Sequence, residues 1–433
     1  MKIAFIYPHL AEMRASDAMQ PLCFGLLAAR TPPDIELKLF DDRVEAVDYE
    51  TDADLVALSV QTFTAKRSYR IADRFRLRGI PVIMGGCHPS LLPDEAGRHT
   101  DALVIGDGEA LWPQILRDAG KGKLRKVYQG DNTAPMQDLI PDRRIFRGKK
   151  YSLLVPVQFG RGCRYSCDFC SMHTIYGNTL RQRDIDEVVR ELNGIKQKLI
   201  FFVDDNLFIN FRQTENLLNA IAPLKKRWVA QISVDSAWNS ELLKSMRRSG
   251  CLAVFVGFES LEERNLRQMN KKGNLKGGTY AEAVERFRDQ GIMVVGAFVF
   301  GYDYDTPDTI RQVLDFSLEQ KLCLAHFNPL FPTPGTPLYN RLAGEKRLRF
   351  DRWWLSNEYR YGEAMFHPTR MTPEQLSEGC LQARIEFNRY SVYVKRAMDF
   401  KANGRSPFSL GVYLLANFIS RREIFRKQGV LLG

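Results

Sequence analysis

The sequence predicts an α/β protein with two parallel-sheet modules in series and a helical C-terminal region. Short apolar runs alternate with amphipathic helical stretches along most of the chain, and one segment rich in charge, Gly and Pro interrupts this alternation. Near-continuous apolar runs are typical of buried parallel strands, and strand–helix alternation is typical of parallel sheets. The expected divisions are 1–120 and 151–340 for the two modules, 121–150 for a linker and 341–433 for the helical region.

The first module contains five strand candidates and at least two helices. The apolar runs lie at 2–8, 35–41, 54–60, 81–86 and 102–106. Helical patterns at 64–78 and 108–118 predict a doubly wound, Rossmann-like sheet. Such sheets bind ligands at the carboxyl ends of their strands, where the polar or glycine-bearing turns 59–64, 85–90 and 106–109 are expected.

The second module repeats the strand–helix unit six times. Its strand candidates are 152–160, 199–205, 228–235, 252–260, 293–301 and 324–331. Its helical segments lie near 184–197, 211–223, 240–249, 278–290 and 307–320. Six such units predict a full or partial parallel barrel, with its active site at the carboxyl ends of the strands.

A tight cysteine cluster, "GRGCRYSCDFCSMH", follows the first strand of this barrel. Cys163, Cys167 and Cys170 have the spacing C-x3-C-x2-C, which favours a site for a soft metal. Zinc would need a fourth ligand, and His173 could provide one. Alternatively, a [4Fe–4S] cluster held by three cysteines leaves one iron free to bind another molecule.

The cluster and its setting resemble the radical S-adenosylmethionine superfamily, whose C-x3-C-x-aromatic-C loop follows the first strand of a partial (β/α)6 barrel. Phe169 is the matching aromatic residue. Further matches are "FFVDDN" at 201–206, "VFVGFES" at 254–260 and "VVGAFVFGYDYDT" at 294–306. The resemblance implies that the open iron binds S-adenosylmethionine, whose reductive cleavage gives a 5′-deoxyadenosyl radical inside a barrel that excludes water.

Polar residues at the strand ends are the expected S-adenosylmethionine ligands. The resemblance places the second-strand motif on the methionine amino group and Glu259 near the cofactor. Helix N-capping is the alternative role for such carboxylates. The expected set is Asp204, Asp205, Asn206, Asp235 and Glu259.

The first module resembles the cobalamin-binding-domain-containing class of this superfamily. The residues that carry this are "DDRVE" after the second strand, "GGCHPS", "GDGE" and the later segment "FPTPGTPLYNRL" at 331–342. The segment "DDRVEAVDYE" lacks the histidine that ligates cobalt in many cobalamin domains, so a cobalamin without a protein histidine ligand is expected. The glycines could instead only permit tight turns. The expected cobalamin-binding residues are Ser59, Thr62, Thr64, Gly85, Gly86, His88, Gly106, Gly108 and Glu109.

The favoured function is therefore a cobalamin-dependent radical enzyme that modifies an unactivated carbon, with methyl transfer from methylcobalamin to a substrate radical as the first hypothesis. Radical oxidation, cyclisation or rearrangement without methyl transfer is the second. A zinc-stabilised binding protein is a third, and it leaves the barrel unexplained.

Composition limits the partners. Apolar residues make up 45% and charged residues 26%, which argues against disorder. The net charge of +11 is spread along the chain and no nucleic-acid motif accompanies it, so no nucleic-acid partner is expected. Scattered single cysteines favour the cytoplasm. The expected partners are a small-molecule or lipid-like substrate and an electron donor such as flavodoxin or ferredoxin. The apolar stretch 408–419 is expected to be a buried or interface helix, with a peripheral membrane contact as the alternative.

Overall fold

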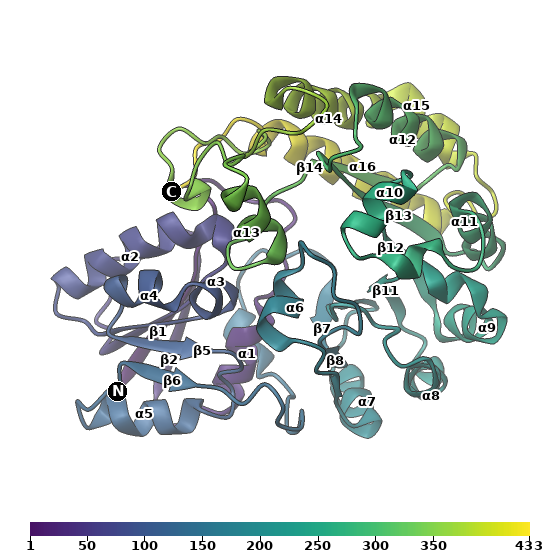
Figure 1. Cartoon of the computed structure of the whole chain (residues 1–433). Helices are drawn as coiled ribbons and strands as arrows, with labels where there is room; N and C mark the ends of the chain where they lie inside the picture. The colour runs from purple at the N-terminus through teal and green to yellow at the C-terminus, as the bar shows by residue number, and fades with distance from the viewer.

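Two six-stranded parallel sheets make up the centre of the computed structural model, which describes residues 1–433. The first has the strand order β2-β1-β3-β4-β5-β6 and the second the order β14-β13-β12-β11-β10-β7. The sheets stand side by side, with the C-terminal helices beside the second sheet and above the first (Figure 1). The α/β fold class predicted from the strand–helix alternation is confirmed by this architecture.

The N-terminal sheet is covered by helices on both faces. Alternate residues of β1 face opposite sides: Ile3 and Phe5 pack with α1 and α5, whereas Ala4 and Ile6 pack with α2. The strands are β1 Lys2–Tyr7, β2 Glu36–Asp41, β3 Leu55–Ser59, β4 Val82–Gly85, β5 Ala102–Ile105 and β6 Val127–Gln129. The helices are α1 Leu22–Ala29, α2 Ala65–Leu77, α3 Cys87–Leu91, α4 Pro93–Ala96 and α5 Trp112–Gly120.

The stretch 121–150 is partly ordered into the N-terminal sheet. Within it, β6 pairs in parallel with β5, Leu103 opposite Val127. Phe146 is buried against the α1 side of the same sheet. The sequence of this stretch predicts only a linker, because a three-residue edge strand is too short to show a periodic apolar pattern.

The second sheet forms an open barrel, since β7 and β14 are its two edges. Its strands are β7 Val155–Val157, β10 Leu199–Phe202, β11 Arg227–Ile232, β12 Cys251–Glu259, β13 Met293–Phe300 and β14 Leu324–Pro329. The helices on its outer face are α7 Ile185–Gly194, α8 Phe211–Ile221, α9 Ser240–Ser249, α10 Glu263–Gln268, α11 Tyr280–Asp289 and α12 Pro307–Glu319. The largest apolar core lies between these helices and the sheet. The short strands β8 Gly160–Arg161 and β9 Arg181–Gln182 flank α6 Ser171–Tyr176, next to the cysteine loop.

The C-terminal region joins the two sheets. Its helices are α13 Pro337–Gly344, α14 Pro373–Phe387, α15 Tyr390–Ala397 and α16 Pro407–Lys427. Between α13 and α14 the chain is mostly irregular, and Trp353, Trp354 and Tyr359 are buried in the core on the α2 side of the N-terminal sheet. Near the end of α16, Glu423 accepts a hydrogen bond from the backbone N–H of Ser16 at 3.1 Å.

The stretch 408–419, expected to be a buried or interface helix, is largely turned outward. Within α16 the fully buried positions are Ser409, Tyr413, Asn417 and Glu423. The apolar residues Leu414, Leu415 and Phe418 are exposed, which excludes burial for them and leaves the interface helix as a prediction. No helix of the chain has both the length and the apolar character needed to cross a membrane.

Candidate functional site

The cysteine loop begins at a glycine that its surroundings require. Gly162 has φ +90°, and an added Cβ would lie 1.9 Å from the carbonyl oxygen of Thr179. Its N–H donates to the Asp205 carboxylate at 2.9 Å. The loop therefore starts in a conformation that only glycine tolerates, and it is tied to the end of β10.

The three thiols lie close enough to affect one another. Burial raises the pKa of Cys167 to about 12; the charge of Lys271 opposes this shift, and the neighbouring Cys170 and Cys163 contribute to it. Burial also raises the pKa of Cys170, opposed by backbone N–H groups of α6. Three adjacent thiolates in this setting need positive charge, which the iron ions of a cluster would supply. The loop thus suits a cationic cluster in its chemistry.

The three sulfur atoms are nevertheless not gathered into one ligand set, since no group of three or more His, Cys, Asp or Glu side chains is arranged to hold a metal ion. Ligation by all three cysteines therefore stays a prediction. The same observation applies to zinc, because His173 does not complete a ligand set either; its Nδ1 is buried without a hydrogen-bond partner.

A charged pair stands beside this loop at the end of β12. Glu259 has φ +65°, a strained conformation for a non-glycine residue, and its carboxylate pairs with Lys271. An added Cβ at Gly257 would lie 2.7 Å from the Lys271 Nζ, so the strand leaves room for the pair. Both members of the pair shift the pKa of Cys167, which places them next to the cysteine loop. No sequence pattern marks Lys271, which follows the short helix α10.

The second-strand motif divides into three roles. Asp204 is buried and accepts hydrogen bonds from the backbone of Phe159, at 3.1 Å, and of Gly160. Asn206 is also buried and bonds Ser233 Oγ at 3.1 Å. With these contacts, Asp204 and Asn206 stabilise the ends of the neighbouring strands. Asp205, which is partly exposed and bonded to the cysteine loop, is the member best placed to meet a cofactor.

Asp235, which follows β11, is already paired with residues of the cysteine loop. Its carboxylate accepts a hydrogen bond from the Tyr165 hydroxyl at 2.7 Å and pairs with Arg164. Both partners belong to the loop itself. The contacts fit a residue that holds the loop in place, so a direct S-adenosylmethionine contact from Asp235 stays a prediction.

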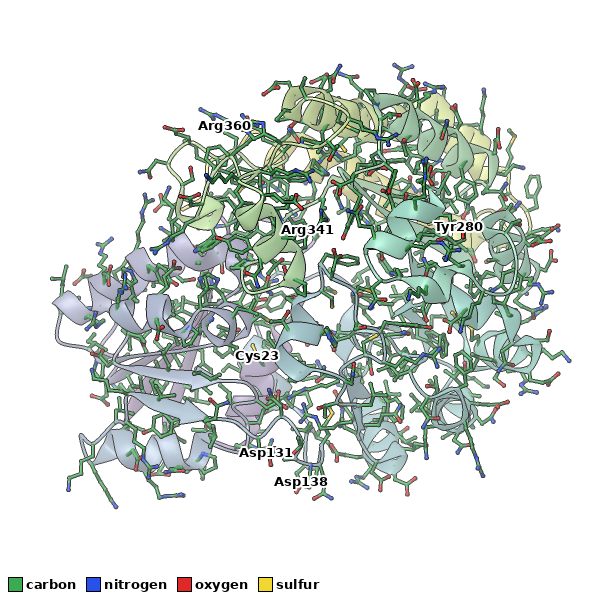
Figure 2. The ribbon with its side chains drawn as sticks, in the orientation of Figure 1. Cys23, Asp131, Asp138, Tyr280, Arg341 and Arg360 are labelled. Atoms are coloured by element: carbon green, nitrogen blue, oxygen red, sulfur yellow. The ribbon has the colours of Figure 1, made fainter.

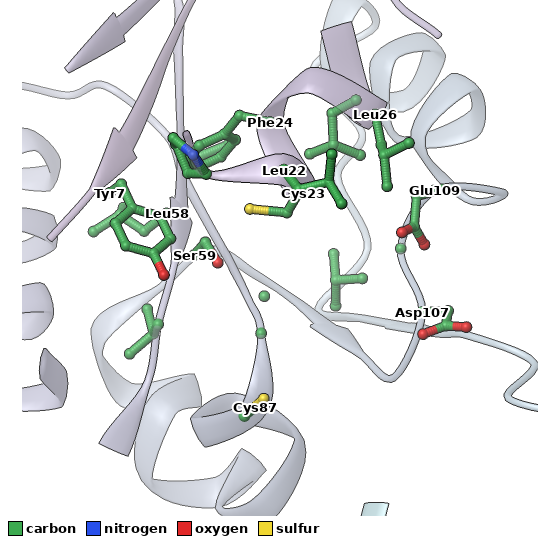
Figure 3. Close-up of a pocket in the computed structure, with 18 of the residues that line it drawn as sticks. Tyr7, Leu22, Cys23, Phe24, Leu26, Leu58, Ser59, Cys87, Asp107 and Glu109 are labelled. Atoms are coloured by element: carbon green, nitrogen blue, oxygen red, sulfur yellow. The ribbon is translucent and has the colours of Figure 1, made fainter. Parts of the chain in front are cut away.

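A cavity of about 480 Å³ lies at the carboxyl ends of the N-terminal strands (Figure 3). Of its 31 lining residues, 17 are hydrophobic. Cys23 on α1, labelled in Figures 2 and 3, lies in this wall. Pro156, Gln158, Arg161 and Val203 of the barrel also line the cavity. A ligand held here would therefore contact both sheets.

Six of the nine residues expected to bind cobalamin line this cavity: Ser59, Gly85, Gly86, Gly106, Gly108 and Glu109. The other three, Thr62, Thr64 and His88, are not among the lining residues. His88 is buried and bonds the Tyr69 hydroxyl at 2.9 Å. The Thr64 hydroxyl accepts a hydrogen bond from the backbone N–H of Gln61 at the start of the turn. These three side chains fit structural roles.

Two glycines of the cavity wall are also required by the backbone itself. Gly86 has φ +106°, and an added Cβ would lie 2.8 Å from the Val60 carbonyl oxygen. Gly106 has φ +74°, and an added Cβ would lie 2.4 Å from Asn132 Oδ1. The turn-forming alternative considered for these residues therefore accounts for both positions, although both line the cavity.

An ion-pair cluster joins the cavity wall to the barrel. Arg161 of β8 pairs with Asp107 at 2.9 Å and with Glu109. Arg181 of β9 pairs with Asp107 at 2.7 Å. The carboxylate of Glu109 is thus used to fix the two sheets together. Arg161 and Asp107 also affect the pKa of Asp205, which burial raises, so the cavity and the cysteine loop share a boundary.

The cavity wall fits a large, weakly polar cofactor. If that cofactor contains a metal, no side chain of the wall is suited to coordinate it. No histidine lines it. Burial raises the pKa of the Cys23 and Cys87 thiols to about 11, so both stay neutral at pH 7 and are poor metal ligands. An apolar ring surface is what a corrinoid needs, and these residues fit one held without axial ligation by the protein.

Comparisons with known proteins identify the family. Residues 157–317 match the model of the radical SAM superfamily. The chain is 33% identical to the bacteriochlorophyllide d C-12(1)-methyltransferase of Chlorobaculum tepidum over 354 residues, which cover 79% of this chain and 76% of that protein. The chain belongs to the radical S-adenosylmethionine superfamily. Membership confirms the prediction of a radical enzyme with a [4Fe–4S] cluster and S-adenosylmethionine, which the zinc-stabilised binding protein does not match.

Two further similarities extend over both sheets. The hopanoid C-2 methylase of Rhodopseudomonas palustris is 29% identical over 363 residues, 80% of this chain and 68% of that protein. The solved structure of the cobalamin-dependent S-adenosylmethionine radical enzyme OxsB, with aqua-cobalamin and S-adenosylmethionine bound, has a TM-score of 0.65. At 16% identity it covers 96% of this chain and 72% of that one. The predicted fold of a Rossmann-like module followed by a radical S-adenosylmethionine barrel is thereby confirmed.

Proposed function

We propose that this protein is a cobalamin-dependent radical C-methyltransferase that acts on an unactivated carbon of a largely apolar small molecule. The cavity shared by the two sheets carries this proposal, because it adjoins the cysteine loop through Asp107, Arg161 and Asp205. The two relatives named above are a chlorophyllide methyltransferase and a hopanoid methylase, which supports methyl transfer to an apolar molecule.

The barrel residues would hold the radical-generating cofactors. Cys163, Cys167 and Cys170 would ligate the cluster, whose bound S-adenosylmethionine supplies the radical. Glu259 offers a carboxylate to a cationic amino group, and Lys271 beside it offers an ammonium to a carboxylate. The free amino acid end of S-adenosylmethionine has both groups. Asp205 lies at the boundary towards the N-terminal cavity.

The N-terminal cavity would hold cobalamin, which supplies the methyl group when bound. Tyr7, Leu58 and Trp112 give it aromatic and aliphatic surface. Ser59, the last residue of β3, lines the cavity and offers a small polar side chain there. A cobalt atom without a histidine or thiolate ligand from the chain is proposed, as the absence of a histidine in "DDRVEAVDYE" first indicated.

Anaerobic reconstitution with iron, sulfide and hydroxocobalamin, followed by assay with S-adenosylmethionine and dithionite as the reductant, tests this function. Bacteriochlorophyllide d and a hopanoid would be offered as substrates, and 5′-deoxyadenosine, S-adenosylhomocysteine and methylated product would be measured. A methylated product formed together with both nucleosides supports the proposal. Formation of 5′-deoxyadenosine and a substrate-derived product without S-adenosylhomocysteine would favour radical oxidation, cyclisation or rearrangement instead.

Partners beyond the substrate are proposed on physical grounds. The cluster needs an electron, so a reduced flavodoxin or ferredoxin is the proposed donor, and such donors fit the cytoplasmic location predicted from the cysteines. We propose an anionic membrane as a further contact. The helices α15 and α16 and the segment between them expose apolar side chains, here called the α15–α16 surface: Val394, Met398, Phe400, Leu414 and Phe418. Exposed basic residues stand around these apolar side chains, namely Lys395, Arg405 and Arg422.

Vesicle co-sedimentation tests the membrane contact. The protein should sediment with phosphatidylglycerol vesicles more than with phosphatidylcholine vesicles. Phe400→Ser combined with Leu414→Ser should weaken this, whereas Leu77→Ser, an exposed apolar residue on α2, should not. Equal sedimentation of the three proteins would remove the α15–α16 surface from consideration.

A further inference from the structure

One buried arginine of α14 has neither a counter-charge nor a full set of hydrogen bonds. Six arginines of the chain are less than a tenth exposed, and four of them pair with carboxylates within 4.0 Å. Those four are Arg67, Arg161, Arg181 and Arg183. Arg396 has no carboxylate but donates to three backbone carbonyls and to Asn417 Oδ1. Arg384 has neither arrangement.

Arg384, on the last turns of α14, makes a single hydrogen bond. Its Nε donates to the Cys380 carbonyl oxygen at 3.2 Å, and its buried Nη2 has no partner. Burial lowers the pKa of Arg384, and the ionisable groups that affect this pKa are one thiol and two phenols, those of Cys380, Tyr361 and Tyr359, with no carboxylate among them. A buried guanidinium without a partner costs free energy, which an anionic ligand would recover.

The inner face of the barrel sheet comes close to this guanidinium. α14 packs against β14, the edge strand. Along β14, Ala325 and Phe327 belong to the outer core, so Leu324, His326 and Asn328 face inward. Arg384 is near enough that its charge, after the larger effect of burial, lowers the pKa of His326.

The same inner face offers a ring surface that solvent can reach. His326 stacks with Phe255 of β12, at 6.5 Å between ring centroids and 14° between planes. Gln231, on the inner face of the central strand β11, is exposed, and His326, Phe255 and Asn328 are only partly buried. Side chains in the middle of a parallel sheet are usually inaccessible, so solvent reaches farther into this barrel than is usual for such a sheet.

We infer that the substrate bears a carboxylate that Arg384 binds, with the His326–Phe255 stack supporting an adjoining apolar ring. The planar guanidinium suits a carboxylate, because its parallel N–H groups can donate to both oxygens. This inference deepens the proposed function, on which it rests, by giving the substrate class as a ring-bearing carboxylic acid.

A matched pair of probes tests this assignment. Equilibrium dialysis of the reconstituted holoenzyme would compare 4-bromobenzoate with its neutral isostere 4-bromobenzamide. The acid should bind at least about tenfold more tightly, as expected for a buried charge-assisted pair. Arg384→Met should abolish this preference. Arg347→Gln is the control, since Arg347 is a partly buried arginine that already pairs with Asp303 and Glu345.

The outcomes separate this inference from the proposed function. Equal affinity for the two probes, no binding of either, or a preference that survives Arg384→Met would overturn the inference. If Arg384→Met does not fold, Arg384→Lys keeps the charge without the planar fork, and the preference should then fall but not vanish. Corrinoid content is measured on the same samples. A protein without corrinoid would contradict the proposed function, whatever its preference between the two probes.

Discussion

The two parallel sheets end in different chemistry, although both are built from the same strand–helix unit. At the ends of the N-terminal strands the cavity is lined by the Tyr7 phenol, by small residues and by protonated thiols. The two carboxylates there, Asp107 and Glu109, are neutralised by Arg161 and Arg181. The barrel rim instead carries the cysteine loop, Asp205 and the Glu259–Lys271 pair. The fold therefore places two sites edge to edge, and the side chains decide that one suits a bulky apolar cofactor and the other a charged one.

The largest effect should follow from removal of one cluster ligand. Cys163→Ala, Cys167→Ala or Cys170→Ala should each lose bound iron and reductive cleavage of S-adenosylmethionine, because three thiolates are the least that holds such a cluster at an open iron. Iron analysis and 5′-deoxyadenosine formation measure both. Cys251→Ala, in the outer core of the barrel, is the control and should keep its iron. An iron-free Cys251→Ala protein would contradict the assignment of the loop.

A smaller effect is expected at the charged pair of the rim. Glu259→Ala should preserve the cluster spectrum but weaken S-adenosylmethionine binding by about 1–3 kcal/mol, the cost of a charge-assisted hydrogen bond. Part of that loss would come from an unpaired Lys271, so the double variant Glu259→Ala, Lys271→Met separates the two contributions. Glu262→Ala, at the cap of α10, is the control. Unchanged affinity in Glu259→Ala would leave that carboxylate a purely structural role.

A pH dependence of stability distinguishes a structural carboxylate of the same rim. Burial raises the pKa of Asp305 to about 7, against hydrogen bonds from the backbone N–H groups of Gly301 and Tyr302 and from Asn265. Because the folded protein holds the proton that the unfolded chain releases near pH 4, stability should fall as pH rises from about 4 to 7, by at most about 1.4 kcal/mol per pH unit.

Asp305→Asn should flatten this dependence, because the amide does not ionise. The thermal midpoint between pH 5 and 7.5 is the measurement, with Asp308→Asn, an exposed residue of α12, as control. Identical pH profiles for Asp305→Asn and the wild type would show that Asp305 does not titrate in this range.

The regular strands could be predicted from sequence because apolar runs and helical periods mark them directly. β12, for example, was expected at 252–260 and spans Cys251–Glu259. α1 was missed, since "LCFGLLAA" is apolar on every side and has no helical period. In α16 the apolar run suggested burial, yet the structure buries the face with Tyr413 and Asn417.

The cysteine loop could be predicted because its spacing is local in the sequence. The Arg161 ion pairs and the place of Lys271 could not, since both depend on how distant segments meet. Asp204 and Glu109 stand at positions that predict cofactor contacts. In the folded protein, however, Asp204 accepts hydrogen bonds from backbone N–H groups and Glu109 pairs with Arg161. Residue type and order do not reveal which carboxylates are already satisfied.

Corrinoid retention tests most directly the claim that the two sheets hold two different cofactors. The wild type, reconstituted with cluster and hydroxocobalamin and passed through gel filtration, should keep stoichiometric corrinoid without spectral signs of histidine ligation. Ser59→Phe, which fills the N-terminal cavity, should lose the corrinoid and keep its iron, whereas Ser240→Phe, exposed on α9, should keep both. A wild type that cleaves S-adenosylmethionine but retains no corrinoid, or a Ser59→Phe protein that retains as much as the wild type, would contradict the account.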